Sequence, residues 1–231
     1  PVLSRGLGDV YKRQGSVHFG ITGEDLLREE VSDLESIIQL VTPLGFGHAD
    51  VVVAIPNSWV DVATMADLAE VASDFRLHKG QLMRVATKYI HLATDYFAAN
   101  DVQDIQIVTS FGATEGAPAS GAAEAIVDIT STGATLAANN LRVPEDGVIL
   151  NSQANLAAAL KANWSSEARS AAKQILARLS AFQRAADMLE VKFDAGAGKV
   201  SQDTLRVFDA VTISITNTVS YTHLRAHETT L

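Results

Sequence analysis

The strongest limit on the fold of this chain comes from one apolar run, ADVVVAI at Ala49–Ile55, which stops at Pro56-Asn57. A strand with one face in water alternates apolar and polar residues, whereas a continuous β-branched run is typical of a strand covered on both faces. Such strands belong to parallel or mixed sheets with helices on either side. The run therefore predicts an α/β fold. No apolar stretch reaches 18 residues, so no membrane span is expected.

Strand-like and helix-like segments alternate along the body of the chain, which indicates βαβ units. The expected strands are Val17–Ile21, Leu82–Thr87, Ile105–Thr109, Ala125–Ile129 and Val148–Ala154. The expected helices run through Glu24–Glu29 with Thr22 as the N-cap, Thr64–Phe75, His91–Ala99 and Leu136–Asn140.

The longest expected helix, Ser165–Leu189, has a single apolar stripe at spacings of three and four. Its members are Ala168, Ala172, Ile175, Leu179, Phe182, Ala186 and Leu189. The stripe fits packing on its own domain, and it also fits presentation to a partner subunit. A short helix at Asp203–Phe208 and a strand at Ala210–Ile215 are expected to follow.

Composition excludes several classes of protein. The chain has 231 residues, of which 47% are hydrophobic and 19% charged, as in a globular protein with a sizeable core. A net charge of −9 argues against a non-specific nucleic-acid binder. The absence of cysteine excludes disulfides and thiolate metal sites, and it fits a reducing compartment. We expect a cytoplasmic protein that binds neither nucleic acid nor membranes.

Both ends lack the periodicity of the body. Residues 1–14 and 220–231 resemble translated sequencing-adapter read-through, so we expect two non-native tails and a lost native N-terminus. In the second tail, His223 and His227 stand at i and i+4 and could chelate a metal only if that segment were helical.

The chemistry is expected in the hydroxyl-rich loop Thr130–Thr135, which follows the strand Ala125–Ile129. Ligands of α/β folds bind beyond the carboxyl ends of strands. The free amides at a helix start, its dipole and several hydroxyls suit a phosphate, and Gly133 lets the backbone come close. The loop has no lysine, so it is not an ATPase P-loop. Simple helix capping remains an alternative from this loop alone.

Asp128 strengthens the phosphate interpretation. A carboxylate beside a phosphate cradle can accept hydrogen bonds from ribose hydroxyls or hold Mg²⁺. Without a ligand, a nearly buried charge at this place would be costly.

Several blocks of the sequence together resemble ATP phosphoribosyltransferase, and they occur in that family's order. They are FGITGEDLL at Phe19–Leu27, LGFG at Leu44–Gly47, RVATKY at Arg84–Tyr89, the window Glu115–Leu136, and ILNSQA at Ile149–Ala154. The resemblance covers about residues 15 to 160. It departs where the family's Pro-Lys-Gly-Arg-like loop is missing, and at His18 and Ile90, where many members have aspartate and proline.

The resemblance implies an α/β fold of two lobes, like type II periplasmic binding proteins, with an incomplete first lobe and the active site in the cleft. The implied order is residues 15–83 in the first lobe, 84–150 in the second with the phosphoribosyl-pyrophosphate loop, and 151–219 returning to the first lobe and the C-terminal helix. The implied reaction joins N1 of ATP to C1 of the phosphoribosyl group and releases pyrophosphate, with Mg²⁺, as the first step of histidine biosynthesis.

The family pattern assigns roles to particular residues. The 5-phosphate is expected on Ser131, Thr132, Gly133, Ala134 and Thr135. Asp128 is expected on the ribose hydroxyls, with Glu115 near the ribose or metal, as the catalytic pair. Thr22 and Gly23 are expected to face the cleft, and Arg84 and Lys88 to contact polyphosphate. Mg²⁺ is expected to arrive with the substrate, with Asp128 as its candidate protein ligand.

Length and ending resemble the short form of the family, which works with a regulatory subunit similar to histidyl-tRNA synthetase. Three alternatives stay open. A non-catalytic solute-binding module can share the fold. A nucleobase phosphoribosyltransferase of Rossmann-like type usually has two adjacent acids before its loop, whereas Val127 precedes Asp128 here. The isolated chain, finally, is expected to be inactive if strands of the first lobe are missing.

Overall fold

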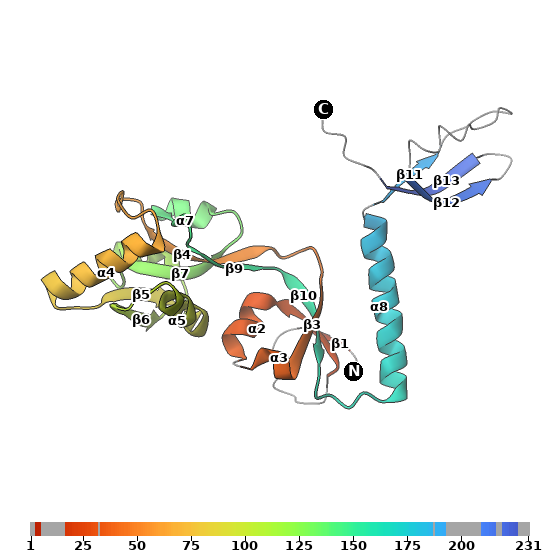
Figure 1. Cartoon of the computed structure of the whole chain (residues 1–231), viewed down its shortest axis with the longest axis horizontal. Helices are drawn as coiled ribbons and strands as arrows, with labels where there is room; N and C mark the ends of the chain where they lie inside the picture. The colour runs from red at the N-terminus through yellow and green to blue at the C-terminus, as the bar shows by residue number, and fades with distance from the viewer. Residues whose placement is uncertain are drawn as a thin grey trace. The chain divides into compact units, whose positions relative to one another are not determined.

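The structure is a computed structural model, which describes residues 3–5, 17–31, 33–186, 188–192, 209–215 and 219–225. The chain forms two compact units, Pro1–Asn163 and Trp164–Leu231. Figure 1 labels the elements of both, and each unit is described by itself.

A six-stranded mixed sheet is the centre of the first unit. Its order is β6-β5-β7-β4-β8, and β9 also pairs with β4. β5 is parallel to both β6 and β7, whereas β4 is antiparallel to β7. The strands are β4 (Ala49–Pro56), β5 (Met83–Thr87), β6 (Ile105–Thr109), β7 (Ala125–Thr130), β8 (Leu141–Arg142) and β9 (Val148–Ser152). The mixed α/β sheet predicted from the apolar run is confirmed.

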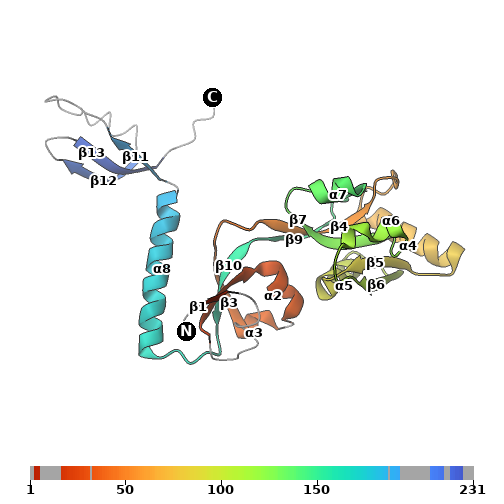
Figure 2. The ribbon, with the colours of Figure 1, turned by 180° about the vertical axis from the view of Figure 1, so that it is seen from behind.

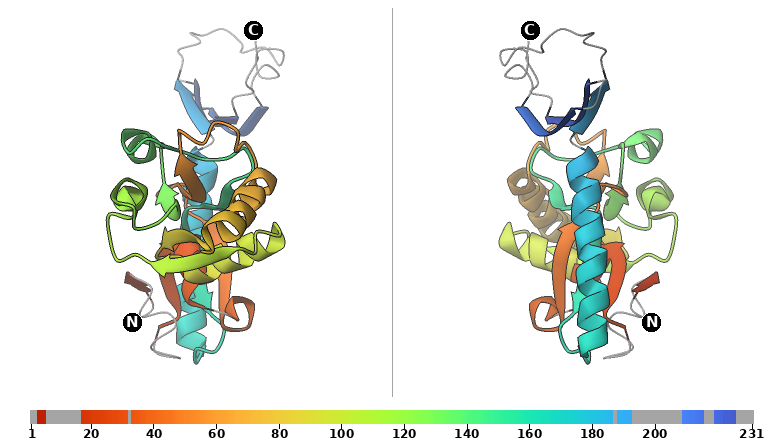
Figure 3. Two further views of the ribbon diagram at one scale, coloured as in Figure 1. Left: turned by 90° about the vertical axis from the view of Figure 1, so that its left-hand side faces the viewer. Right: turned by 90° about the vertical axis from the view of Figure 1, so that its right-hand side faces the viewer.

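Helices cover both faces of this sheet. Val51, Val53 and Ile55 of β4 pack on the face of α4 (Met65–Lys79) and α5 (Ile90–Ala99). Val52 and Ala54 pack on the opposite face, beside α6 (Ala117–Ser120) and α7 (Ala134–Ala138). Figure 2 and Figure 3 show these two layers of helices with the sheet between them. Two covered faces explain why every residue from 51 to 55 is apolar.

A second sheet has the order β1-β2-β10-β3. Its strands are β1 (Leu3–Arg5), β2 (Phe19–Gly23), β3 (Ile38–Pro43) and β10 (Ala154–Ala159), and its helices are α2 (Glu24–Glu30) and α3 (Leu34–Ile37). Its small core consists of Leu27, Ile38, Ala157 and Ala159. We call this sheet with α2 and α3 the first lobe, and residues 49–152 the second lobe.

The chain passes between the lobes twice, from β3 to β4 and from β9 to β10. The lobe boundary expected at residue 83 therefore differs from the observed one, because β4 pairs with β7 from Asp50–Thr130 to Ala54–Ile126. The single strand expected at Val148–Ala154 is two strands, since the chain changes sheet at Gln153.

The second unit contains α8 (Ser166–Ala186) and an antiparallel sheet of β11 (Met188–Lys192), β13 (Val219–Arg225) and β12 (Asp209–Ile215). The expected strand near residue 210 is confirmed. One expectation is wrong: Leu189 lies in β11 rather than in the long helix. His223 lies in β13, so the helix on which metal chelation by this histidine depended is not found at its position, and residue 227 lies outside the described residues. The helix expected at Asp203–Phe208 lies outside the described residues.

The two ends of the chain carry strands, β1 and β13, where the sequence indicated no regular pattern. The interpretation of these ends as non-native tails stays a prediction. Over the described part of the chain, no helix has the length and apolar character needed to cross a membrane.

Candidate functional site

The candidate site lies at the carboxyl ends of β5 and β7. These strands are parallel and in register from Val85–Ala125 to Thr87–Val127. The residues that come next, Lys88 and Asp128, therefore reach the same edge of the sheet. This is the edge at which ligands of open α/β sheets bind.

The loop after β7 turns sharply into α7. Gly133 is the N-cap of this helix and has a left-handed backbone, with φ of 73° and ψ of −5°. A side chain at this position would be strained whatever space surrounds it. The turn is closed by the amide of Gly133, which donates to the Thr130 hydroxyl at 2.9 Å. The sequence prediction of a glycine turn that leads into a short helix is confirmed.

The loop uses some of its amides internally and leaves others open. The Ala134 amide donates to the Thr132 hydroxyl over 3.4 Å, so it joins Gly133 in having a local partner. Among the described residues, no acceptor is found for the amides of Ser131 and Thr132. The side chains of Ser131, Thr132, Ala134 and Thr135 are exposed. The loop thus presents amides and hydroxyls outward, although fewer amides than a fully open cradle would offer.

Asp128 is half-buried beside this loop, and its charge interacts with Lys88 and Glu115. Burial raises the pKa of the carboxyl, and the negative charge of Glu115 adds to that rise. The Ile129 amide, which donates to Oδ1 at 2.8 Å, and the Lys88 ammonium lower the same pKa. Taken together, these effects raise the pKa of Asp128. The structure therefore brings Asp128, Glu115 and Lys88 into one electrostatic group.

Arg84 is not part of this group. It lies at the amino end of β5, where its guanidinium Nη2 is 2.5 Å from Oε1 of Glu124. The Arg84 amide also donates to the Glu124 carboxylate, at 2.7 Å. Because Glu124 directly precedes β7, this ion pair lies at the opposite end of the strands from Asp128. The structure separates Arg84 from the other expected site residues.

Thr22 and Gly23 end β2 in the first lobe. Thr22 is buried, and its hydroxyl donates at 3.4 Å to the carbonyl of Gly23. The prediction that Thr22 caps α2 is wrong: the N-cap is Gly23, and the Asp25 amide in the first turn of the helix donates to the Ser152 hydroxyl at 3.1 Å. The physical reason is that Thr22 stands one residue before the N-cap, and its hydroxyl donates to the Gly23 carbonyl rather than accepting from an amide of α2.

Sequence analysis missed a buried polar group next to this turn. Asp25 accepts hydrogen bonds from the hydroxyls of Tyr89, at 2.9 Å, and Ser152, at 2.8 Å. Its partners are 64 and 127 positions away in the sequence, so no local spacing could indicate the contact. The only signal is that all three lie inside the blocks that carry the family resemblance.

A metal would find few protein ligands here. Among the described residues, no group of three or more His, Cys, Asp or Glu side chains is arranged to hold one. Mg²⁺ commonly keeps several waters and uses one or two carboxylates together with substrate phosphates. The neighbouring carboxylates of Asp128 and Glu115 fit that mode of binding.

Comparison with known proteins places these features in a family. The family model of ATP phosphoribosyltransferase matches residues 9–181. Curated ATP phosphoribosyltransferases from Nitrobacter winogradskyi and Rhodopseudomonas palustris are 58% and 56% identical over 179 residues, or 78% of this chain. That match covers 55% of each relative, so the chain spans about half the length of these proteins.

A solved structure shares the fold. The ATP phosphoribosyl transferase (HisG:HisZ) complex from Thermotoga maritima superposes with a TM-score of 0.56, at 23% identity, over 75% of this chain and 73% of that one. This likeness agrees with the expected two-lobed α/β architecture. The family model and the curated relatives agree with each other, and the chain belongs to the ATP phosphoribosyltransferase family.

Proposed function

We propose that this protein transfers the phosphoribosyl group of 5-phosphoribosyl-1-pyrophosphate to N1 of ATP, giving 1-(5-phosphoribosyl)-ATP and pyrophosphate in the first step of histidine biosynthesis. One observation carries the proposal. A half-buried carboxylate, Asp128, stands near the carboxyl end of β7, where Ile129 and Thr130 separate it from a loop with open amides and exposed hydroxyls. A sugar phosphate needs this combination of donors and acceptor.

Each residue of the group has a distinct part in the proposal. The backbone amides and hydroxyls of Ser131–Thr135 hold the 5-phosphate. This role replaces the alternative that the loop only caps a helix. Asp128 accepts hydrogen bonds from the ribose hydroxyls and so orients the sugar. Lys88, which is exposed and neighbours Asp128, faces the pyrophosphate. Arg84 has no part in binding, because Glu124 holds it at the other edge of the sheet.

The reaction needs no nucleophilic side chain. The bond from C1 of the ribose to the pyrophosphate oxygen breaks, and a bond from C1 to N1 of ATP forms. Positive charge builds on the sugar as the leaving group departs, and the carboxylates of Asp128 and Glu115 stabilise it. Holding both substrates in line supplies much of the remaining acceleration. Mg²⁺, when bound with the substrate, neutralises charge on the departing pyrophosphate.

A second part of the proposal concerns α8 and the assembly of this protein with a partner subunit. The Thermotoga maritima structure is a HisG:HisZ complex. On α8 of the present chain, Phe182 keeps 72% of its surface exposed, which is unusual for a large apolar side chain on an amphipathic helix. We assign the chain to the short form of the family and propose that α8 meets a regulatory subunit similar to histidyl-tRNA synthetase. The proposed location of the complex is the cytoplasm.

Release of pyrophosphate tests the catalytic proposal. The assay uses the complete gene product that contains this sequence, since the chain spans about half the length of its relatives. We expect release that requires both ATP and 5-phosphoribosyl-1-pyrophosphate, and a loss of roughly 100-fold or more in turnover for Asp128→Asn, a size typical of removing one preorganised electrostatic group.

The matched control is Glu70→Gln, which changes an exposed carboxylate on α4 and should leave turnover unaltered. Full activity in Asp128→Asn would contradict the role given to that carboxylate. Binding of small solutes without any pyrophosphate release would contradict the enzyme itself and favour the solute-binding alternative.

A further inference from the structure

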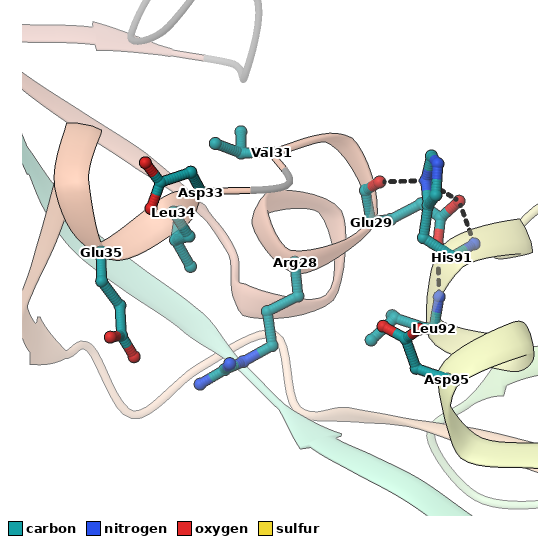
Figure 4. Close-up of a pocket in the computed structure, with 9 residues that line it drawn as sticks. All are labelled: Arg28, Glu29, Val31, Asp33, Leu34, Glu35, His91, Leu92 and Asp95. Carbon is teal, nitrogen blue, oxygen red and sulfur yellow. Dashed lines mark hydrogen bonds and ion pairs between the residues drawn. The ribbon is translucent and has the colours of Figure 1, made fainter. Parts of the chain in front are cut away.

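Contacts between the lobes concentrate where α2 of the first lobe meets the start of α5 of the second. Both polar and apolar side chains line the space between them. A hollow of about 520 Å³ opens between α2, α3 and α5. Figure 4 shows its lining, which includes the charged side chains of Arg28, Glu29, Asp33, Glu35 and Asp95. Hydrogen bonds from Glu29 of α2 to the start of α5 contribute to the connection between the two helices.

The first of these connections centres on Asp25, only 5% of which is exposed. Its Oδ2 accepts from the Tyr89 hydroxyl and its Oδ1 from the Ser152 hydroxyl. Ser152 also accepts from the Asp25 amide at 3.1 Å. A buried carboxylate without such donors would be costly, so the three groups depend on one another. Burial, together with the charge of Asp25, raises the pKa of Tyr89, which keeps the phenol protonated as a donor.

The second connection caps α5. Tyr89 is the N-cap of this helix but makes no side-chain cap bond. Instead, the Glu29 carboxylate of α2 accepts from the amides of His91, at 3.1 Å, and Leu92, at 3.0 Å. Figure 4 shows the Glu29 side chain directed at this helix start, with the His91 ring also close to it. A negative charge at the N-terminus of α5 also interacts favourably with the helix dipole.

Gly23 is tied to the same group. A Cβ placed on Gly23 would lie 2.3 Å from Oδ1 of Asp25, far inside contact distance. The Asp25 side chain could move away only by giving up its bonds to Ser152 and Tyr89. Glycine at position 23 therefore has a structural reason of its own, independent of any substrate.

We infer that Asp25, Tyr89, Ser152 and Glu29 form an interlobe latch, which fixes the two lobes relative to one another during phosphoribosyl transfer. The inference rests on the proposed function. Latch residues adjoin site residues on both lobes: Asp25 follows the Thr22–Gly23 turn, and Tyr89 follows Lys88. The latch thereby sets the distance from that turn to Lys88 and Asp128. Its members are positioning residues, because they bond to each other, and Gly23 serves the latch rather than the substrate.

The latch is tested by an interlobe distance together with kinetics. The chain has no cysteine, so two introduced cysteines, Glu35→Cys on α3 and Glu70→Cys on α4, carry spin labels without further changes. Both positions are exposed. We expect a narrow distance distribution in the parent and a broader one in Asp25→Ala and Tyr89→Phe. We also expect kcat/KM to fall roughly tenfold, in line with one unpaired buried group.

A double-mutant cycle separates the latch from a substrate role of Gly23. Gly23→Ala is expected to lower kcat/KM about tenfold by itself and less than twofold in an Asp25→Ala background, because contacting residues are not additive. An undiminished cost of Gly23→Ala in that background would overturn the assignment of Gly23 to the latch. Unchanged distances in both Asp25→Ala and Tyr89→Phe would overturn the latch itself.

The conservative variant Asp25→Asn keeps an acceptor for one hydroxyl. It should therefore recover part of the narrow interlobe distance distribution and part of kcat/KM. Should Asp25→Ala fail to fold, Tyr89→Phe carries the test alone, because it removes a single hydroxyl. Failure of the proposed function has a separate signature: no turnover in the parent, with interlobe distances that still respond to latch variants.

Discussion

At the scale of single residues, Asp128 combines a cost to the fold with the role in sugar binding that we propose for it. Burial and the charge of Glu115 both work against its ionised form, and the Ile129 amide and Lys88 offset this only in part. A residue that serves folding alone would be placed where its charge is better solvated. Such a conflict between stability and local environment is typical of functional sites.

The raised pKa of Asp128 predicts how its removal affects stability. The folded protein holds the proton more tightly than the unfolded chain, so ionisation of this carboxyl weakens the fold as pH rises through the folded pKa. Asp128→Asn should therefore raise Tm at pH 7 in the absence of substrate. The gain should vanish as pH falls toward the unfolded value of about 3.9. Thermal unfolding across this pH range checks the prediction, and a lower Tm for the variant at pH 7 would contradict it.

Lys88 and Arg84 form a matched pair, since both were expected to contact polyphosphate and only Lys88 lies near Asp128. We expect Lys88→Gln to raise KM for 5-phosphoribosyl-1-pyrophosphate roughly tenfold, because an attraction to phosphate is lost. Arg84→Gln should leave KM unchanged and lower Tm slightly through loss of the Glu124 pair. Steady-state kinetics and thermal unfolding of both variants provide the comparison. Equal effects of the two substitutions on KM would contradict the proposal that only the residue at the carboxyl end of β5 contacts the pyrophosphate.

At the scale of elements, α4 shows local signals that fully define a helix. Thr64 accepts from the Asp67 amide, and the Asp67 carboxylate accepts from the Thr64 amide, which is a capping box. At the other end Gly80 takes a left-handed conformation, with φ of 65°. The helix runs four residues beyond the expected end at Phe75, because Arg76–Lys79 are exposed and leave no apolar periodicity to detect.

The capping box of α4 gives a stability prediction without an effect on chemistry. Thr64→Ala should cost about 1 kcal/mol, the typical value for loss of an N-cap. For a protein of this size that cost corresponds to a fall in Tm of roughly 2–4 °C. Turnover should stay unchanged, because α4 lies away from the carboxyl ends of β5 and β7. Thermal unfolding and the pyrophosphate assay measure the two quantities, and Thr64→Ser, which keeps the hydroxyl, is the control.

At the scale of the whole molecule, the chain builds its site by crossing between the lobes twice. β4 enters the six-stranded sheet and β9 leaves it, and both are paired there before the chain returns to β10. The loop after β7 and the Thr22–Gly23 turn consequently belong to different lobes. The relation between the lobes then depends on contacts such as those of Asp25 and Glu29.

Assembly with a regulatory subunit belongs to this scale as well. Replacing Leu179 and Phe182 of α8 by aspartate should weaken the complex, because charges would replace apolar side chains on the proposed contact face. Light scattering of the mixed subunits should show a smaller assembly for the double variant. Arg178→Gln and Ser180→Ala, at neighbouring exposed positions, are the controls. An unchanged size in the aspartate variant would exclude α8 from the interface.

The sequence by itself determined the elements whose signals are local. The apolar run of β4, the periodicity of α4 and α5 and the glycine turn at Gly133 lie within short windows, and the structure has these elements within a few residues of the expected bounds. The blocks that resemble the family occur in the family's order, and one of them also indicated the loop after β7. These features depend on neighbours along the chain, which a sequence displays directly.

Only the tertiary structure decided which of the expected residues lie together. It placed Arg84 against Glu124, assigned β4 and α4 to the second lobe, and joined Asp25 to hydroxyls 64 and 127 positions away. Strand order, register and contacts between lobes depend on residues distant in the chain, and no local pattern encodes a partner at such a separation. The glycine turn proposed to bind phosphate could therefore be located from the sequence, whereas the contacts between the lobes could not.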